Sequence, residues 1–322
     1  MNKLMIFAAC TCLVLASCND FLEEKPKSLL SSRDFNKTED QIRSNINGLY
    51  RRAAVTAHSS AGSAYIGSAM TIPGMLTGYF SNSYEGQERV CAYARTLTRQ
   101  EQTNNVSGFV DGIWGSCYGA INVANVALKA MPEVPMSDEA RKVLLGEAKF
   151  FRAFNYFMLV KWFGDVPMTT QPSENVNDLE KPRTPVADIY TLIEQDLTEA
   201  VAALPDQTWQ KNGHRITKYV ALQALTAVYM QQGKYQQASE TAKQIINSGK
   251  YSLTENEDMA LKSAYNKLRT IDDLPEVLYA VEYDADISTT SWRPTYAFSS
   301  SASNAFKSYN IFQRVMDPTL AI

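Results

Sequence analysis

The sequence predicts a mainly α-helical protein, a scaffold of tetratricopeptide-like helix pairs with long irregular loops and little strand. Three observations support this prediction. From Ile113 onwards, apolar residues recur at helical spacing over most of the chain. One stretch of that region matches the tetratricopeptide pattern. Residues 56–111 instead carry many glycines, serines and asparagines with no clear period, together with too many aromatics for a disordered segment.

Residues 1–17 are expected to be a lipoprotein signal peptide. Lys3 precedes an apolar run that ends at Ala16 and is too short to cross a bilayer comfortably. The run closes on LASC, residues 15–18, which looks like a bacterial lipobox. Cleavage there would leave Cys18 to carry lipid such as palmitate, and several acyl chains anchor a protein stably. The alternative is an ordinary signal peptide with a chance cysteine.

Residues 18–40 read as the lipidated cysteine followed by an extended tether, with the acids Asp20, Glu23 and Glu24, then Pro26 and serines. Beyond the tether, Cys91 and Cys117 are able to pair in an exported protein, but their spacing does not say whether they meet.

The spacing of apolar residues and the capping signals predict the following helices. A short one covers residues 41–52, and a longer one covers residues 113–131. Ser137 is a good N-cap for a third helix that reaches Trp162 and stops at Gly164. A fourth opens with Thr184 as cap and Pro185 in the first helical position.

Residues 219–251 carry the tetratricopeptide pattern. Leu222, Leu225, Thr226 and Tyr229 belong to its first helix, Gly233 to the turn, and Ala238, Ala242 and Ile245 to its second helix, with Gly249 as the C′ residue. Because a single repeat cannot bury its own face, neighbouring helices must stack on it.

The aromatic run within residues 144–163 raises the question of a stacking surface for a ligand. Its apolar residues occupy two sides of the helix, with Phe151 on one and Phe154 on the other. A helix that is apolar on two sides lies between neighbours. We therefore expect these rings in the core and the ligand surface elsewhere.

Four segments resemble the SusD/RagB family, outer-membrane lipoproteins of Bacteroidetes. GEAKFFRAFNYFMLVKWFGDVPM (residues 146–168) is similar to the family's signature helix and turn. The others are NDFLEEKP (19–26), WGSCYGAINVANVAL (114–128) and RITKYVALQALTAVYMQQGKYQQASETAKQIINSGKYSL (215–253). Family members continue well past the point where this chain stops. The resemblance thus implies that residues 41–322 are the N-terminal part of the family fold, with the C-terminal part missing.

The resemblance implies a non-catalytic receptor without a cofactor, anchored in the outer membrane through lipid on Cys18 and facing the cell exterior. Such receptors bind oligosaccharides, or peptides in the RagB branch, and deliver them to a SusC-like TonB-dependent transporter. The acids after Cys18 are similar to export signals of Bacteroidetes surface lipoproteins, although a solvated linker explains them equally well.

Sugar binding needs flat aromatic faces beside polar groups. Trp292 and Tyr296 lie in a polar loop after the strand-like residues 276–284, roughly where family members place binding aromatics. Tyr79 and Tyr84 lie in the other polar, aromatic segment. We predict these four as ligand contacts. Local loop packing is the alternative for each.

Other functions fit the sequence less well. GSCYG (115–119) is like a nucleophile elbow around Cys117, with His58 or His214 as partner, but that motif requires a preceding strand. A glycosidase would need two facing carboxylates, for which the candidates are Asp272, Asp273, Glu255 and Glu257. A net charge of −3 does not indicate nucleic-acid binding. A tetratricopeptide scaffold that binds only a protein partner is the stronger rival.

Overall fold

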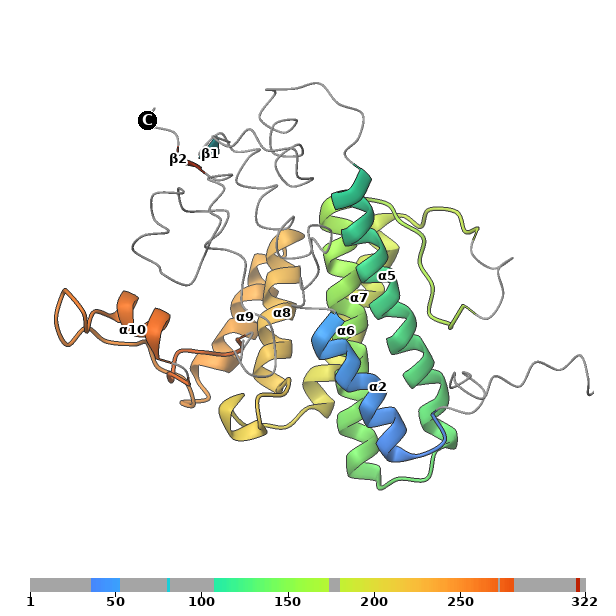
Figure 1. Cartoon of the computed structure of the whole chain (residues 1–322), viewed down its shortest axis with the longest axis horizontal. Helices are drawn as coiled ribbons and strands as arrows, with labels where there is room; N and C mark the ends of the chain where they lie inside the picture. Colours follow the sequence, from blue (N-terminus) through green and yellow to red (C-terminus); the bar gives the residue numbers. More distant parts are fainter. Residues whose placement is uncertain are drawn as a thin grey trace, which may run out of the picture.

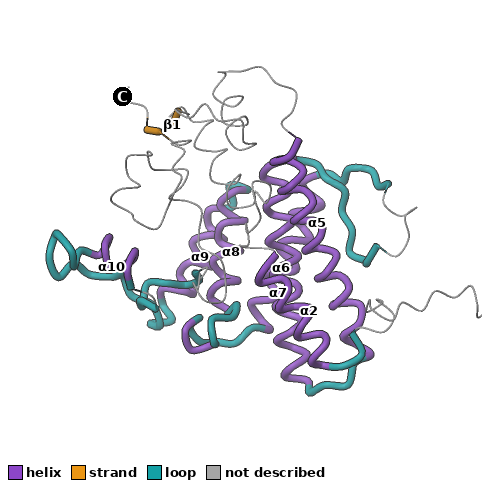
Figure 2. Tube along the Cα trace, viewed as in Figure 1, coloured by secondary structure: helices purple, strands orange, loops and turns teal. Residues whose placement is uncertain are grey.

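The computed structural model describes residues 36–52, 80–81, 107–173, 180–271, 273–280 and 317–318. Helices dominate these residues (Figure 2), which confirms the predicted fold class. Strand in them is confined to the two-residue β1 (Phe80–Ser81) and β2 (Asp317–Pro318), which pair antiparallel. None of the described helices has the length and hydropathy needed to cross a membrane. The predicted signal peptide and the predicted lipid site Cys18 lie outside the described residues, and both stay predictions.

The helices form a bundle with a helical hairpin beside it (Figure 1). The bundle consists of α2 (Glu39–Arg52), α5 (Ser107–Ala130), α6 (Asp138–Phe163) and α7 (Val186–Ala203). The hairpin consists of α8 (Lys218–Gln231) and α9 (Tyr235–Ile246), and α8 packs on α7. The short α10 (Ala264–Thr270) stands away from the bundle, at the far side of the hairpin.

Helix α6 is the centre of the core, because it packs against α2, α5, α7 and α8. Phe151 and Leu159 are fully buried, and Phe150 and Phe157 are nearly so. The rings contact one another: Phe150 and Phe154 stack with centroids 5.9 Å apart. Burying one such side chain stabilises the fold by roughly 1.5–3 kcal/mol. The prediction that this aromatic run is core is confirmed.

The ends of α6 are also as predicted. The Ser137 hydroxyl accepts a hydrogen bond from the Ala140 N–H at 3.2 Å, and Gly164 follows the helix with φ 67°. Helix α5, however, begins at Ser107, so residues 107–111 are helical where we expected irregular structure. Serine and glycine are acceptable in a first turn but give no apolar period by which to detect it.

Helix α7 starts later than predicted. Its first residue is Val186, and Pro185 occupies the N-cap position instead of Thr184. The Val186 N–H is bonded by the Asp165 carboxylate at 2.9 Å, and Thr184 forms an isolated β-bridge with Val166. The capping side chain therefore belongs to a residue outside the helix, and capping rules that consider only neighbouring residues do not predict it.

The tetratricopeptide pair is confirmed in α8 and α9. Leu222, Leu225 and Ala238 are buried, and Gly233 makes the turn with φ 72°. The hydroxyls of Thr226 and Thr241 meet at 2.8 Å between the two helices. Gly249 has the expected positive φ, 64°. It lies two residues beyond the C-cap Asn247, because α9 ends at Ile246, so it is not the C′ residue.

The strand predicted from residue 276 is wrong over its described part. Residues 276–280 form turn and irregular structure, and the Val277 N–H donates to the Leu274 carbonyl at 2.9 Å. In this strand-like stretch, Leu278 packs against the α8–α9 hairpin and Tyr279 against the main core.

Asp206, which follows α7, joins the start of α8 to the segment after α9. Its carboxylate accepts hydrogen bonds from the Tyr219 hydroxyl and the Lys250 ammonium, and Lys218 lies 3.5 Å away. These hydrogen bonds, the one from Lys250 first, lower the pKa of Asp206 to about 2. The side chain is 55% exposed, so solvent screens the interaction and its contribution is small.

We expect this carboxylate to make stability depend on acid. A depressed pKa in the folded state means that the contribution is present above the ordinary value of 3.8 and is lost as pH falls towards about 2. Asp206→Asn should therefore lower the melting temperature slightly at pH 5 and leave it unchanged near pH 2. Lys250→Met should likewise lower the melting temperature slightly at pH 5. Equal effects of Asp206→Asn at both pH values would contradict the assignment.

Candidate functional site

The predicted ligand contacts, Trp292, Tyr296, Tyr79 and Tyr84, lie outside the described residues, and they stay predictions. The structure describes the scaffold from which their segments depart. Phe80, the neighbour of Tyr79 in sequence, pairs with Pro318 in the two-stranded ladder. Trp292 and Tyr296 lie between residue 280 and Asp317, where the described residues break off and resume.

A buried ionic centre joins three helices of the bundle. Arg152 on α6 donates to both carboxylate oxygens of Asp196 on α7, at 2.7 and 2.8 Å. It also donates to the Asn125 side-chain oxygen on α5 at 3.1 Å. All three side chains are at least nine-tenths buried. This bidentate geometry fixes how α5, α6 and α7 sit relative to one another.

The same centre holds the loop that follows α6. The Asn125 amide donates to the carbonyls of Thr169 and Gln171 at 3.0 and 3.3 Å. Tyr156 donates to the Thr169 carbonyl and accepts from its N–H, while Tyr118 donates to the Pro167 carbonyl at 2.6 Å. Side chains on the helices thereby satisfy the loop's backbone groups, which need partners wherever they are buried.

Burial dominates the electrostatics of this centre. It raises the pKa of Asp196, and the hydrogen bonds and charge of Arg152 oppose that rise. It also raises the pKa of Tyr156 to about 12. A phenol in this state donates and accepts hydrogen bonds but does not ionise near neutral pH. The centre is therefore suited to holding structure and has no feature of a proton-transfer site.

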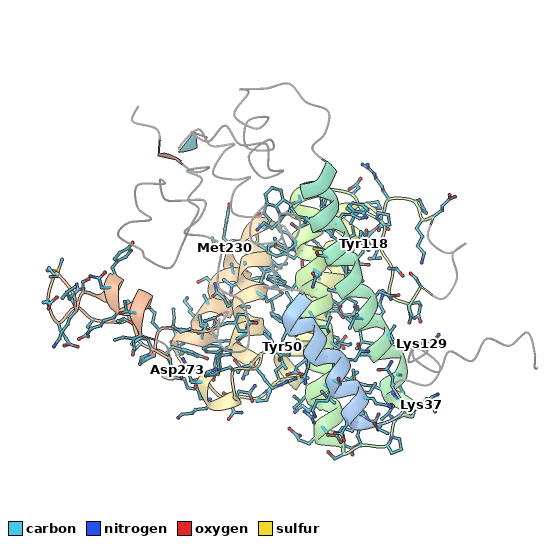
Figure 3. All side chains as sticks on the ribbon, viewed as in Figure 1. Lys37, Tyr50, Tyr118, Lys129, Met230 and Asp273 are labelled. Carbon is cyan, nitrogen blue, oxygen red and sulfur yellow. The ribbon has the colours of Figure 1, made fainter. Side chains whose placement is uncertain are left out.

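A second buried centre ties α2 to α6 and to the segment before α8. Glu147, 1% exposed, accepts from Arg215 at 2.7 and 2.9 Å and from the Tyr50 hydroxyl at 2.6 Å. The Tyr50 hydroxyl also accepts from the Ile216 N–H at 3.0 Å. Burial is the main reason why the pKa of Tyr50 is raised. Tyr50 is labelled in Figure 3, beside α2.

The two centres were missed in the sequence, although it contained a signal for them. Glu147 and Arg152 stand among apolar residues on a helix predicted to be buried, and charged residues are almost never fully buried unless they are paired. Our interpretation of this segment considered its aromatic residues and left the charged residues out. The partners Asp196 and Arg215 lie far away in sequence and carry no local signal.

The thiol of Cys117 does not fit the role of a nucleophile. Cys117 lies inside α5, so the residues directly before it are helical where the motif requires a strand, and it is a fully buried free thiol. Burial raises its pKa to about 12, whereas a reactive cysteine needs a lowered pKa and some access to solvent. The interpretation of GSCYG as a helical segment is confirmed.

The acidic candidates for glycosidase chemistry are engaged elsewhere or exposed. Glu257 forms ion pairs with Lys262 and Lys267, and their hydrogen bonds lower its pKa, the opposite of what a general acid requires. Asp273 pairs with His214 at 3.2 Å. Glu255 is exposed, and Asp272 lies outside the described residues. A search of the described residues finds no cluster of acids, histidines and cysteines suited to a metal.

A groove of about 270 Å³ opens between the start of α6 and the end of α7. Leu145, Gly146 and Ala203 line it together with charged residues such as Lys142. Gly146 lets the helices come close here, since a Cβ atom would lie 3.0 Å from that of Ala203. No aromatic residue is among those that line the groove, so it lacks the flat platform expected of a sugar site.

These features define a class of protein: a helical scaffold whose buried charges hold its helices and the loop after α6 in place. Residues 20–230 match the family model SusD-like_3, described as starch-binding associating with outer membrane. The chain belongs to this family. The resemblance seen in the sequence is thereby confirmed.

Curated relatives are SusD-like proteins of Bacteroidetes. The chain is 27% identical over 306 residues to SusD-like protein P2 of Formosa agariphila, which covers 93% of this chain and 56% of that protein. It is 23% identical over 233 residues to a SusD-like protein of Bacteroides ovatus, covering 71% and 39%. The chain thus spans about half the length of the curated relatives it matches.

Solved structures have the same fold. A SusD-like protein from Bacteroides fragilis matches with a TM-score of 0.63 and 19% identity, over 81% of this chain and 48% of that one. A laminarin-binding SusD-like protein matches with a TM-score of 0.59 and 25% identity, over 73% and 49%.

Breaking the Arg152–Asp196 pair should be costly. Arg152→Ala leaves a buried carboxylate without its counter-charge, and we expect a loss of about 3–5 kcal/mol in the free energy of unfolding, measured with urea. The double variant Arg152→Met/Asp196→Leu should recover most of it, because both charges are gone. The control is Arg43→Ala, which removes an exposed ion pair within α2 and should cost about 0.5 kcal/mol or less. Equal losses in Arg152→Ala and the control would refute this role.

Cys117 should resist alkylation in the folded protein. Iodoacetamide reacts with the thiolate, which is scarce at a thiol with a pKa of about 12 and is shielded from solvent. Mass spectrometry of the peptide that contains Cys117 should show labelling only after unfolding in urea. Full labelling of the native protein, at the rate of the unfolded one, would show that the thiol is accessible.

Proposed function

We propose that this protein is a cell-surface receptor that binds an oligosaccharide and delivers it to a SusC-like TonB-dependent transporter, without catalysing a reaction. The observation that carries the proposal is the family match over residues 20–230, whose description joins starch binding to the outer membrane. The solved relative that binds laminarin supports a glycan as ligand.

The aromatic segments are the proposed binding surface. Trp292 and Tyr296 stack on sugar rings from one segment, and Tyr79 and Tyr84 from the other. The aromatic rings of α6, the richest aromatic run of the described chain, are packed in or against the core. Aromatic residues of the irregular segments are therefore the better candidates for contact with a ligand.

Lipid on Cys18 completes the proposal. The signal in residues 1–17 and the cysteine after it would hold the receptor at the outer membrane, with residues 18–40 as a tether. A tethered receptor stays near its transporter, which raises the effective concentration of one for the other.

Isothermal titration against a glycan panel tests the ligand class. The panel starts with laminarin and includes plant, host and bacterial oligosaccharides, with peptides as a separate arm. We expect measurable heat with one glycan class. Heat with peptides alone would favour a RagB-like receptor. Silence in both arms, from a protein with a cooperative thermal melt, would favour a scaffold that binds only its protein partner.

Trp292→Ala tests the proposed contact. Loss of a stacked ring should weaken binding of the glycan found in the panel at least about tenfold, since aromatic side chains dominate such contacts and 1.4 kcal/mol is a factor of ten. The matched control is Tyr235→Ala on α9, whose ring is 71% exposed on the scaffold and should leave binding unchanged. Unchanged affinity in Trp292→Ala would exclude that residue.

A further inference from the structure

Residues 273–280 have no regular secondary structure, yet several contacts hold them to the scaffold. Gln210 donates from its amide to the carbonyls of Leu274 and Val277, at 3.2 and 3.3 Å. The Tyr279 ring meets Trp209 edge-on, with centroids 5.9 Å apart. Residues 252 and 254 add hydrogen bonds to Pro275 and Glu276. This short segment therefore has a defined path along the turn before α8.

A contact between a histidine and a carboxylate stands where this path begins. The Nε2 atom of His214 lies 3.2 Å from a carboxylate oxygen of Asp273, and the His214 ring stacks on Trp209 with centroids 4.2 Å apart. Trp209 is only 2% exposed, so the imidazole rests on a fixed surface. Figure 3 labels Asp273 between α10 and the turn of residues 209–214.

The backbone at both ends of the pair is unusual. His214 and Asp273 each have φ 61°, in the left-handed region, and Asn36 is the other non-glycine residue with positive φ in the described chain. Such conformations are uncommon for residues with a Cβ atom and persist when their surroundings hold them. Two strained residues thus face each other across one contact. The two unusual backbone conformations therefore point to one structural role for this contact.

We propose that the His214–Asp273 pair, stacked on Trp209, is a positioning clasp. It holds Asp273 in the left-handed conformation and so fixes the start of the path of residues 273–280, the last described residues before the segment that contains Trp292 and Tyr296. The two residues position the ligand segment without touching ligand. The effect on binding rests on the proposed function, whereas the effect on residues 273–280 does not.

Three substitutions at Asp273 separate the contact from the backbone. Asp273→Asn keeps both a hydrogen-bond acceptor and a residue type that tolerates the left-handed region. Asp273→Gly keeps that conformation and removes the contact. Asp273→Val removes the contact and opposes the conformation, because a β-branched residue fits it badly.

The first measurement is hydrogen exchange of residues 273–280, followed by mass spectrometry of the full chain in detergent. Exchange should be near wild type in Asp273→Asn. It should rise about two- to fivefold in Asp273→Gly, the equivalent of one partly exposed hydrogen bond. In Asp273→Val it should rise at least about tenfold, because strain is added. Exchange of α6 should be the same in all variants. Wild-type exchange in Asp273→Val, or equal increases in Asp273→Asn and Asp273→Val, would overturn the clasp.

The second measurement is affinity for laminarin, or for the glycan that binds best in the panel. We expect the same order of variants, with unchanged melting temperatures, and rescue by Asp273→Asn. A purely structural role would lower the melting temperature and the affinity together. Wild-type affinity in Asp273→Val would overturn the positioning role while leaving the receptor intact. If the wild type binds no glycan, the proposed function fails and the exchange experiment still decides the clasp.

Discussion

Helix α6 has helices packed on several of its sides, so the polar groups in its middle must find partners inside the protein. Glu147 and Arg152 are charged and nearly inaccessible to water, and removing a charge from water costs several kcal/mol. Each finds a bidentate partner on a different element: Asp196 on α7 for Arg152, and Arg215 before α8 for Glu147. The arrangement of the bundle follows from this constraint. A shift of α7 along α6 would part Arg152 from Asp196 and leave two buried charges without compensation.

Because a hydrophobic replacement can be as stable as a buried pair, the pairs are better understood as determinants of arrangement than of stability. Apolar rings such as Phe151 tolerate several packings, whereas two carboxylate oxygens facing one guanidinium tolerate one. The Arg152 centre also extends to Asn125, and through it to the carbonyls of Thr169 and Gln171. One set of polar contacts therefore sets both the register of three helices and the path of the loop after α6.

The sequence predicted the elements whose signals are local. Apolar spacing located α2, α6, α8 and α9, and Ser137 and Gly164 marked both ends of α6 because capping depends on neighbouring residues. The sequence did not predict features that depend on residues far away in the chain. Asp165 caps α7 from another segment, and a pattern typical of a strand at residues 276–280 gave way to contacts with Gln210 and Trp209. For the candidate site, composition indicated which segments combine aromatic and polar residues. It could not give the positions of those rings, because the spacing of residues within a segment does not show what the segment contacts in the fold.

Scaffold and binding surface are thus under separate physical constraints. Solved relatives keep the fold at about one-fifth to one-quarter identity. The TM-score is 0.56 for a SusD-like protein of Bacteroides vulgatus, 0.63 for that of Bacteroides fragilis and 0.59 for the laminarin-binding protein. A core of this kind accepts many apolar sequences if volume and pattern are kept. Binding segments on irregular connections can then change without disturbing it. A binding segment stays in place on the scaffold only if its connection leaves the scaffold in the same direction. In this chain the Arg152 centre holds the loop after α6, and Trp209 and Gln210 hold residues 273–280. Half-exposed side chains such as His214 and Asp273 contribute little to the core, so their contacts bear on the path of residues 273–280 more than on the stability of the bundle.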